Sequence, residues 1–551
     1  RTWRPQDARD GLRQWARSKA LWPDLVLLIV LALVFGTRLL VVRTLDAPLW
    51  GDSYQHTMIA QLLLDNGGLF DSWEPYARIG RLTYHFGFHS AVAAVQWLMR
   101  LPVAQTTLWT GQLLNALAVL AVYPLAVRVS GSRWGGVGAV LLAGLLSPMP
   151  MFYTNWGRYT QLAGLVILPA AIWLTWQTVD APQRHRSLIA LVALVAGGLA
   201  LTHLRVLLFY GTFVLALVLI SVRRGAWRET LLRLGWASVG AVLLSLPWHL
   251  NALGGNFVHI LGRQLTTGPA QLRSFAKEYN AIGRLETYLP PLLWLTMLLG
   301  LAVGLWRRQR EVLLVGLWCL LLLIAANPTG LSLPGTGVIT NFALFIAVYL
   351  PASLLAGYLI AYVIRLAAGR RAAVALVVLL MVSLSIWGAR QRLGDLDPLG
   401  HALVTHPDMR AAAWIQENTS PDAGFLINSF YAYGGSLIVG GDAGWWLPLL
   451  AGRQNTVPPL IYGTELGRES DYRQQVEELA RQMHTGDLND PAMLDLLQEQ
   501  QVTHVYVGQR QGQVNYNESP VLDPEKLVNS PYYRLAYHQD RVWIFEISIA
   551  E

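Results

Sequence analysis

Eleven apolar runs come close to the length of a membrane-spanning helix. A helix rises 1.5 Å per residue, so about 20 apolar residues cross the hydrocarbon layer of a bilayer. The chain is 54% hydrophobic and 14% charged, whereas an average soluble domain is about 25% charged. The runs are residues 25–42, 107–127, 134–153, 162–179, 187–203, 206–222, 234–250, 289–306, 312–326, 342–364 and 372–387. The sequence therefore predicts a polytopic α-helical membrane protein with about eleven transmembrane helices.

Arginines are concentrated in every second loop between these runs. Because short loops rich in Lys and Arg stay in the cytoplasm, this alternation predicts the orientation of the chain. It holds only if residues 86–98 form an interfacial helix instead of a span. We therefore expect an integral plasma (inner) membrane protein with a basic cytoplasmic N-terminus at 1–24, a transmembrane domain at 25–389, and long external loops at 43–106 and 251–288.

The composition becomes that of a water-soluble domain from about residue 390. The pattern predicts an α/β domain at 390–551, placed outside the cytoplasm by the orientation of the spans. Helices are expected at 409–418 and 472–482 and strands at 424–428 and 504–508, followed by a β-hairpin at 533–547.

Several functions lack their sequence signatures. The single cysteine, Cys319, lies in an apolar run, so no intrachain disulfide can form. The 42 cations are spread between apolar runs instead of gathering on one soluble module, which argues against a nucleic-acid partner. A Walker loop, a His-Glu-x-x-His helix and a Gly-x-Ser-x-Gly elbow are all missing, so ATP-driven transport, zinc proteolysis and serine hydrolysis have no support.

An aspartate follows the first apolar run closely. Residues 48–56 read Pro-Leu-Trp-Gly-Asp-Ser-Tyr-Gln-His, an amphipathic stretch runs on to Leu64, and residues 66–70 read Asn-Gly-Gly-Leu-Phe. By position alone, Asp52 could be a plain helix N-cap. However, the whole segment resembles the first loop of the GT-C superfamily, membrane glycosyltransferases that use polyprenyl-phosphate-linked donors, and is most similar to the catalytic subunit of oligosaccharyltransferase. The resemblance implies that Asp52 binds the acceptor and any metal, or acts as the catalytic base.

A second stretch, in the soluble domain, is similar to the signature Trp-Trp-Asp-Tyr-Gly-Tyr-Trp-Ile of oligosaccharyltransferases. Residues 441–447 read Gly-Asp-Ala-Gly-Trp-Trp-Leu, and Gly452-Arg453 stands where the family has a later Asn-Arg. The resemblance implies acceptor binding by Asp442, Trp445, Trp446 and Arg453. Gly440 and Gly441 replace the tryptophan pair that reads the acceptor sequon, so a glycan, lipid or protein acceptor stays open. The alternative is a turn with two buried aromatic side chains.

A third motif, Asn-Trp-Gly-Arg-Tyr-Thr-Gln at 155–161, stands where the resembled family carries a second acidic, metal-binding motif. It contains no acid. A divalent cation, Mg²⁺ or Mn²⁺, would find a poor cage in Asp52, Gln161 and water, so its second acidic ligand is not identified. Arg158, with Tyr159 and Gln161 beside it, is instead a candidate ligand of the donor phosphate, because a guanidinium pairs well with phosphate oxygens. The alternative is an arginine that snorkels to the interface.

Two further polar clusters lie on the predicted outer face. His203 and Arg205 interrupt a long apolar stretch, and they either cap a helical hairpin or bind the donor phosphate. His56, Tyr84 and His85 either line the acceptor site or lie at the lipid headgroups. Arg38, near the outer end of the first run, is expected to snorkel outward.

Together, these features predict an inverting transfer of sugar from a polyprenyl-phosphate-linked donor to an acceptor at the outer face of the membrane. Asp52 is the expected catalytic residue. Two alternatives remain: a non-catalytic GT-C relative that binds a lipid or partner, and a lipid or sugar transporter. The transporter is disfavoured because the centres of the predicted spans are nearly free of charged residues.

Overall fold

The computed structural model describes residues 21–548 apart from 182–184, 224–226, 254–261, 263–279, 368–370, 434, 466 and 515–520. Most of the predicted N-terminal segment 1–24 and most of the predicted loop 251–288 therefore lie outside the described residues.

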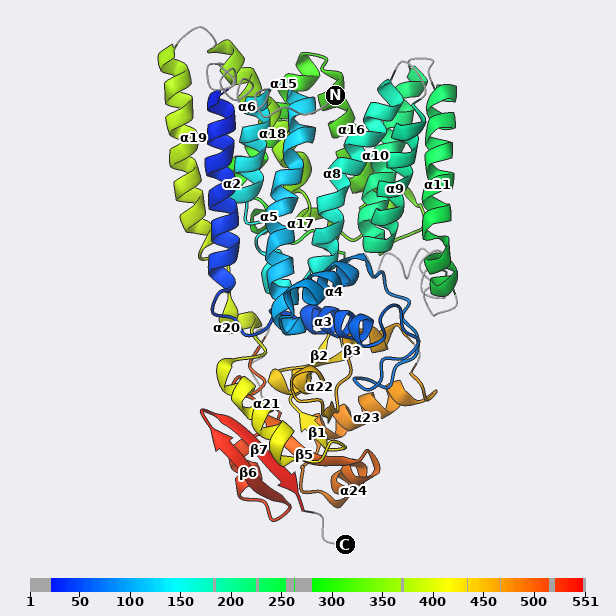
Figure 1. The fold of residues 1–551 in the computed structure, drawn as a ribbon, viewed down its shortest axis with the longest axis vertical. Coiled ribbons are helices and arrows are strands. Elements are labelled where there is room, and N and C mark those ends of the chain that lie inside the picture. The colour runs from blue at the N-terminus through cyan, green and yellow to red at the C-terminus, as the bar shows by residue number, and fades with distance from the viewer. Residues whose placement is uncertain are drawn as a thin grey trace.

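The membrane part is a bundle of helices that run side by side along the long axis of the molecule (Figure 1). Seven of the described helices are long and apolar enough to cross a membrane, and three shorter apolar helices accompany them. The protein is therefore an integral membrane protein, although the predicted number of about eleven spans is not confirmed. The bundle comprises α2 (Leu21–Val42), α5 (Val103–Ser130), α6 (Arg133–Leu141) with a π-helical turn (Leu142–Leu146), α8 (Tyr159–Asp180), α9 (Arg186–Thr202), α10 (Leu204–Arg223), α11 (Trp227–Leu253), α15 (Pro291–Trp306), α16 (Arg310–Ala326), α18 (Tyr349–Leu366) and α19 (Arg371–Arg392).

Two helices lie across the end of this bundle instead of along it. They are α3 (Trp50–Asp65) and α4 (Gly87–Met99), and Figure 1 shows them between the bundle and the C-terminal part. α4 corresponds to the helix predicted at 86–98, and its last turn exposes Trp97, Leu98 and Met99. Short helices in the connections are α7 (Tyr153–Trp156), α14 (Leu285–Tyr288), α17 (Asn341–Ile346) and a 3₁₀ turn (Pro328–Leu331).

The C-terminal part is an α/β domain around a five-stranded sheet. The strand order is β4-β1-β5-β7-β6; β1 is parallel to β4 and β5, and β7 is antiparallel to β5 and β6. The sheet strands are β1 (Gly424–Ile427), β4 (Gln454–Asn455), β5 (Val502–Val507), β6 (Tyr533–Gln539) and β7 (Val542–Ile547). The helices are α20 (Pro398–His401), α21 (His406–Asn418), α22 (Leu447–Leu450), α23 (Tyr472–Thr485), α24 (Pro491–Glu499) and α25 (Pro524–Val528), with 3₁₀ turns at Ala443–Trp446 and Leu460–Gly463.

Every helix and strand that the pattern predicted in this domain is present, and the α/β fold class is confirmed. A second, two-stranded sheet, which was not predicted, is formed by β2 (Ser429–Ala432) and β3 (Leu437–Gly440). Two runs rich in β-branched and aromatic residues flank Gly434-Gly435, which is a hairpin signal that the analysis could have used.

The first loop and the soluble domain share one hydrophobic core. The ring of Tyr54, on α3, lies 5.2 Å from the Trp445 ring and 5.4 Å from the Trp446 ring. Gly51 is required for this packing, because a Cβ there would lie 2.5 Å from a carbon of the Trp445 ring. At the edge of the core, the Thr83 hydroxyl donates to the Glu465 carboxyl. The soluble domain is thereby fixed directly over α3.

Arg38 does not snorkel outward, contrary to the expectation from sequence. Its side chain is fully buried, and its Nε donates to Asn115 Oδ1 at 3.1 Å. The ion pair of Arg392 with Asp395, at 2.6 Å, lies nearby, and its charges act on Arg38. The C-terminal end of α2 is therefore covered by α5 and the end of α19, so the path to the headgroups that snorkelling needs is closed.

Candidate active site

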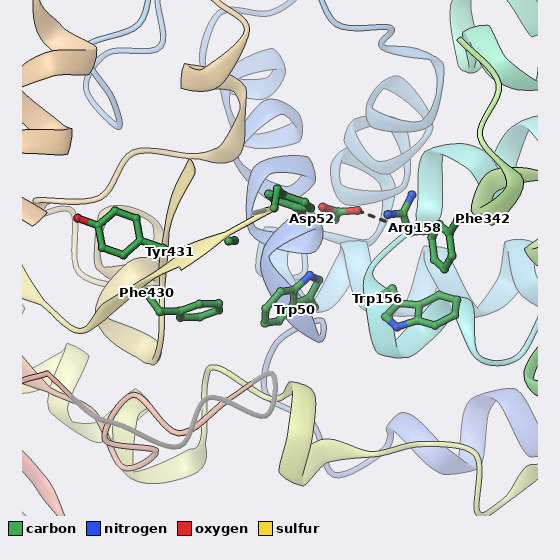
Figure 2. Close-up of a pocket in the computed structure, with 9 residues that line it drawn as sticks. Trp50, Asp52, Trp156, Arg158, Phe342, Phe430 and Tyr431 are labelled. Atoms are coloured by element: carbon green, nitrogen blue, oxygen red, sulfur yellow. Dashed lines mark ion pairs between the residues drawn. The ribbon is translucent and has the colours of Figure 1, made fainter. Parts of the chain in front are cut away.

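A cavity of about 460 Å³ lies where α3, the α7–α8 connection, α17 and β2 meet. Asp52 and Arg158 face each other across it (Figure 2). The other described residues that line it are Trp50, Trp156, Phe342, Phe430, Tyr431, Ala432 and Tyr433. The cavity thus lies between the end of the bundle and the soluble domain, and its volume is typical of a small-molecule site, about 300–1,000 Å³.

The centre of the cavity is an ion pair between two separate motifs. Arg158 Nε lies 4.0 Å from Asp52 Oδ2, and both side chains are about one quarter exposed. Gly157 permits this approach: its φ is +62°, and a Cβ there would lie 2.1 Å from Ser53 Oγ and 2.7 Å from the Ser53 backbone nitrogen. Only glycine combines that backbone conformation with contact against α3.

Arg158 is supported from the bundle side. Its guanidinium lies 4.8 Å from the centre of the Phe342 ring, a cation–π contact. Phe342 is the second residue of α17. The first, Asn341, donates from its Nδ2 to the backbone oxygen of Asn280 at 2.7 Å and to Asn327 Oδ1 at 2.8 Å. This asparagine network holds the start of α17 in place, and with it the ring under Arg158.

The remaining residues of the 155–161 motif hold the backbone around Arg158. Asn155 Nδ2 donates to the Asp395 carbonyl at 2.7 Å, and Asn155 Oδ1 accepts from the Asp397 nitrogen at 2.9 Å. Gln161 Nε2 donates to the Ala343 carbonyl at 3.1 Å, and the buried Tyr159 ring stacks on Phe88. Tyr159 and Gln161 are therefore packed into the fold and do not line the cavity.

Arg205, at the start of α10, adds a second positive charge to the site. The charges of Arg158 and Arg205 both act on the Asp52 carboxyl. Burial raises the pKa of Asp52 above its ordinary value, and the two arginines act in the opposite direction. With Asp52 ionised, two cations and one carboxylate leave a net charge of +1, which favours an anionic ligand.

Histidines and a tyrosine form a buried cluster behind α3. His89 Nε2 lies 3.0 Å from His56 Nδ1, and the His85 and His203 rings lie 4.8 Å apart. The Tyr84 and His85 rings lie 3.9 Å apart. Burial lowers the pKa of His56 and of His85 to about 3, so both imidazoles are neutral at pH 7. The structure brings these predicted site residues together but places them outside the lining of the cavity, so their ligand-binding roles stay predictions.

The predicted acceptor residues of the soluble domain are occupied by internal contacts. Asp442 is fully buried and accepts from Asn428 Nδ2 and the backbone nitrogens of Gly444 and Gly508, each at 3.0 Å. Arg453 Nη2 donates to the carbonyls of Gln416 and Thr419. These two, like Trp445 and Trp446, do not line the cavity. Asp442 holds the turn after β3, Arg453 holds the C-terminal end of α21, and the two tryptophan rings pack against Tyr54.

Sequence reasoning missed the aromatic residues of the cavity. Trp50 and Trp156 stand within the motifs that drew attention to Asp52 and Arg158, but they were not singled out. Phe430, Tyr431 and Tyr433 belong to the missed hairpin and the turn that follows β2. No local pattern places a residue of the soluble domain opposite Asp52, so only the hairpin itself could have been predicted.

Among the described residues that line the cavity, Asp52 is the one acidic side chain that could hold the divalent cation implied by the family resemblance. In the described part of the chain, no group of three His, Cys, Asp or Glu side chains could hold a metal ion. Asp52 faces the cationic Arg158 where a metal site would need a second oxygen ligand.

Comparison with known proteins identifies the fold. No protein-family model matches the sequence, and no curated protein matches it. Among solved structures, the archaeal oligosaccharyltransferase AglB from Archaeoglobus fulgidus, in complex with an inhibitory peptide and a dolichol-phosphate, matches with a TM-score of 0.57 and 14% identity over 94% of this chain and 73% of that chain. ArnT from Cupriavidus metallidurans, bound to undecaprenyl phosphate, matches with a TM-score of 0.56 and 15% identity over 96% of this chain and 98% of that chain.

The chain has the GT-C fold. A third GT-C structure, the mycobacterial arabinofuranosyltransferase AftD, matches with a TM-score of 0.58 and 15% identity over 97% of this chain and 40% of that chain. All three neighbours are glycosyltransferases of the GT-C type, so the GT-C fold expected from the first loop is confirmed. The GT-C fold also accounts for a helical bundle followed by a soluble α/β domain.

Proposed function

We propose that the protein is an inverting glycosyltransferase that moves a sugar from a polyprenyl-phosphate-linked donor to an acceptor at the outer face of the plasma membrane. The proposal rests on the opposition of Asp52 and Arg158 across the cavity, 4.0 Å apart. It takes support from the GT-C fold and from solved GT-C structures that hold dolichol-phosphate or undecaprenyl phosphate.

In the proposed step, an acceptor hydroxyl oxygen attacks the anomeric carbon of the donor and the bond from that carbon to the phosphate oxygen breaks. The hydroxyl proton passes to the Asp52 carboxylate, which acts as general base. The transition state has oxocarbenium character, so it needs a carboxylate on the acceptor side and positive charge on the phosphate side. The new bond forms on the face opposite the leaving phosphate, so the anomeric configuration inverts.

Arg158 and Arg205 bind the phosphate in this scheme. A separation of 4.0 Å exceeds hydrogen-bonding distance, so Asp52 does not occupy the donors of Arg158. A guanidinium has five N–H donors in a fork that matches phosphate oxygens. The two arginines therefore stabilise the negative charge that accumulates on the leaving group as the glycosidic bond breaks.

Orientation follows from the arginine-rich loops of the sequence. The cavity lies at the end of the bundle that faces the soluble domain, and α3 and α4 of the predicted external loop 43–106 lie at the same end. With the N-terminus in the cytoplasm, this end faces outward, where a lipid-linked donor supplies the sugar without a nucleotide.

The test is transfer by the full-length protein in proteoliposomes supplied with radiolabelled polyprenyl-phosphate sugars. Asp52→Asn removes the base and nearly preserves the volume, so transfer should fall to background while thermal unfolding stays unchanged. Asp71→Asn, in the same loop and exposed, is the matched control and should keep full activity. Unchanged turnover in Asp52→Asn would exclude the aspartate from the mechanism. Wild-type protein that binds polyprenyl phosphate but transfers no sugar would favour a non-catalytic lipid-binding relative.

A further inference from the structure

The cavity has an aromatic side that the proposed reaction does not use. Trp156 and Phe342 support Arg158 on the bundle side, whereas Trp50, Phe430 and Tyr433 belong to α3 and the hairpin. We call these last three residues the aromatic wall. Phe430, Trp50 and Trp156 lie in a row in Figure 2, on one side of the Asp52–Arg158 pair. The ring of Tyr431 lies at the outer edge, 5.0 Å from the His484 ring.

Trp50 has an unfavourable backbone conformation. Its φ is +65°, in the left-handed region that bulky L-residues rarely adopt. Its ring lies 6.2 Å from Phe430, tilted by 36°, and 6.4 Å from His401. Such strain persists only where the surrounding structure imposes it, and it is concentrated at ligand-binding sites. Here its effect is to turn the indole into the cavity two residues before Asp52.

The soluble-domain side of the cavity is open to water but carries no charge of its own. Tyr431 and Tyr433 are 45% and 50% exposed, and together with Phe430 and Ala432 they are the described lining residues contributed by the hairpin. The Tyr433 phenol is a neutral hydroxyl at pH 7, because the ordinary pKa of a tyrosine side chain is about 10. A ligand at this wall therefore meets flat rings with polar edges.

A sugar ring has the complementary chemistry. One face of a pyranose or furanose presents C–H groups, which pack against an aromatic ring, while its hydroxyls project from the rim. Resting on the proposed glycosyl transfer, we infer that the aromatic wall is an acceptor subsite that stacks a neutral saccharide ring and presents one of its hydroxyls to Asp52. The acceptor is then a glycan or the sugar headgroup of a glycolipid.

An extended peptide fits the same surface less well. An extended peptide backbone presents amide groups to the flat rings of the wall, whereas one face of a sugar ring presents C–H groups that match them. The described lining residues include no Asn, Gln, Ser or Thr side chain. A charged acceptor is also disfavoured, since Asp52 and Arg158 together are the charged side chains of this lining and they oppose each other.

The experiment uses full-length protein in nanodiscs and measures binding by saturation-transfer NMR. The probes are a panel of neutral disaccharides, namely maltose, cellobiose, gentiobiose, mannobiose and galactobiose, and a neutral peptide that contains Asn, Ser and Thr. At least one disaccharide should receive saturation on its ring C–H protons. Trp50→Ala and Phe430→Ala should each weaken that binding about tenfold or more, whereas Trp50→Phe should keep most of it.

The controls separate this inference from the proposed function. Trp97 lies near the end of α4 and its side chain is 75% exposed, so Trp97→Ala should leave saccharide binding unchanged. Undecaprenyl phosphate binding, measured by thermal shift on the same samples, should survive Trp50→Ala and fall in Arg158→Ala. Three outcomes overturn the saccharide subsite. They are peptide binding without disaccharide binding, binding of neither probe, and disaccharide binding that does not change in Trp50→Ala or Phe430→Ala. Failure of wild-type protein to bind undecaprenyl phosphate counts against the proposed function instead.

Discussion

Asp52 Oδ2 and Arg158 Nε lie 4.0 Å apart across the cavity, although the two residues come from separate loops at the same end of the bundle. Arg158 thus opposes the rise that burial causes in the pKa of the proposed base, and it also places a cation in the cavity for the donor phosphate.

The first prediction concerns pH. A base must be ionised, so activity falls as pH drops through the pKa of Asp52. Burial raises that pKa and Arg158 opposes the rise. Arg158→Ala removes the opposing charge, so the pKa rises further and the acid-side midpoint of kcat/KM moves to higher pH. Arg158→Lys keeps the charge and should move the midpoint less. A midpoint that stays in place or moves to lower pH in Arg158→Ala would show that another group is the base.

The second prediction concerns metals. Because Arg158 supplies positive charge beside Asp52, transfer should persist after treatment with EDTA and dialysis. The measurement is turnover before and after chelation, with added Mg²⁺ or Mn²⁺ as the comparison. Complete loss of activity that either ion strictly restores would mean that a second oxygen ligand completes a metal site.

The third prediction compares two glycines with nearly the same φ. Gly157 (φ +62°) touches Ser53, whereas a Cβ at Gly67 (φ +64°) would meet nothing within 4 Å. Gly67→Ala should cost only the conformational penalty, about 1–2 kcal/mol. Gly157→Ala adds a steric clash with α3 of about 1–3 kcal/mol and displaces Arg158, so activity should fall with stability. Urea unfolding of both variants in mild detergent measures the difference, and equal losses would contradict the close contact.

The fourth prediction tests the strain at Trp50. Glycine usually destabilises a helix relative to alanine by about 1 kcal/mol. At φ +65° the order should reverse, because only glycine adopts that conformation without penalty. Trp50→Gly is therefore expected to be more stable than Trp50→Ala by about 1 kcal/mol, as measured by thermal unfolding. The usual order would show that Trp50 is not held in the left-handed region.

The fifth prediction concerns the contact between the first loop and the soluble domain. Burial raises the pKa of Glu465, the partner of Thr83, to about 7. A carboxyl whose folded-state pKa is raised favours its protonated form, so its contribution to stability is present below its ordinary pKa near 4.5 and is lost as pH rises to about 7.

Glu465→Gln stays neutral and should remove this dependence, leaving the variant more resistant than wild type to limited proteolysis at pH 8. Glu469→Gln, on the same connection and exposed, is the control. Identical pH profiles for wild type and Glu465→Gln would contradict the assignment.

Much of the fold was predictable because the signals are local. A bilayer selects long apolar helices, and a soluble domain alternates apolar and polar residues, so α2, α19, α21 and β5 can be read from short windows. The hairpin of β2 and β3 also carried such a signal around Gly434-Gly435. The burial of Arg38 did not, because it depends on Asn115 and the end of α19, which are distant in sequence.

The candidate site, like the fold, was predictable from local sequence only in part. The sequence by itself determined the membrane bundle and the α/β domain, because hydropathy and charge act on each segment separately, and its resemblance to the GT-C family nominated Asp52. Only the tertiary structure decided that Arg158 faces Asp52, that Asp442 and Arg453 are occupied by internal hydrogen bonds, and that Trp50 and Phe430 line the cavity. These are contacts between segments, and they are settled by the packing of α3 against Trp445 and Trp446, where each side chain fits only in the presence of the others.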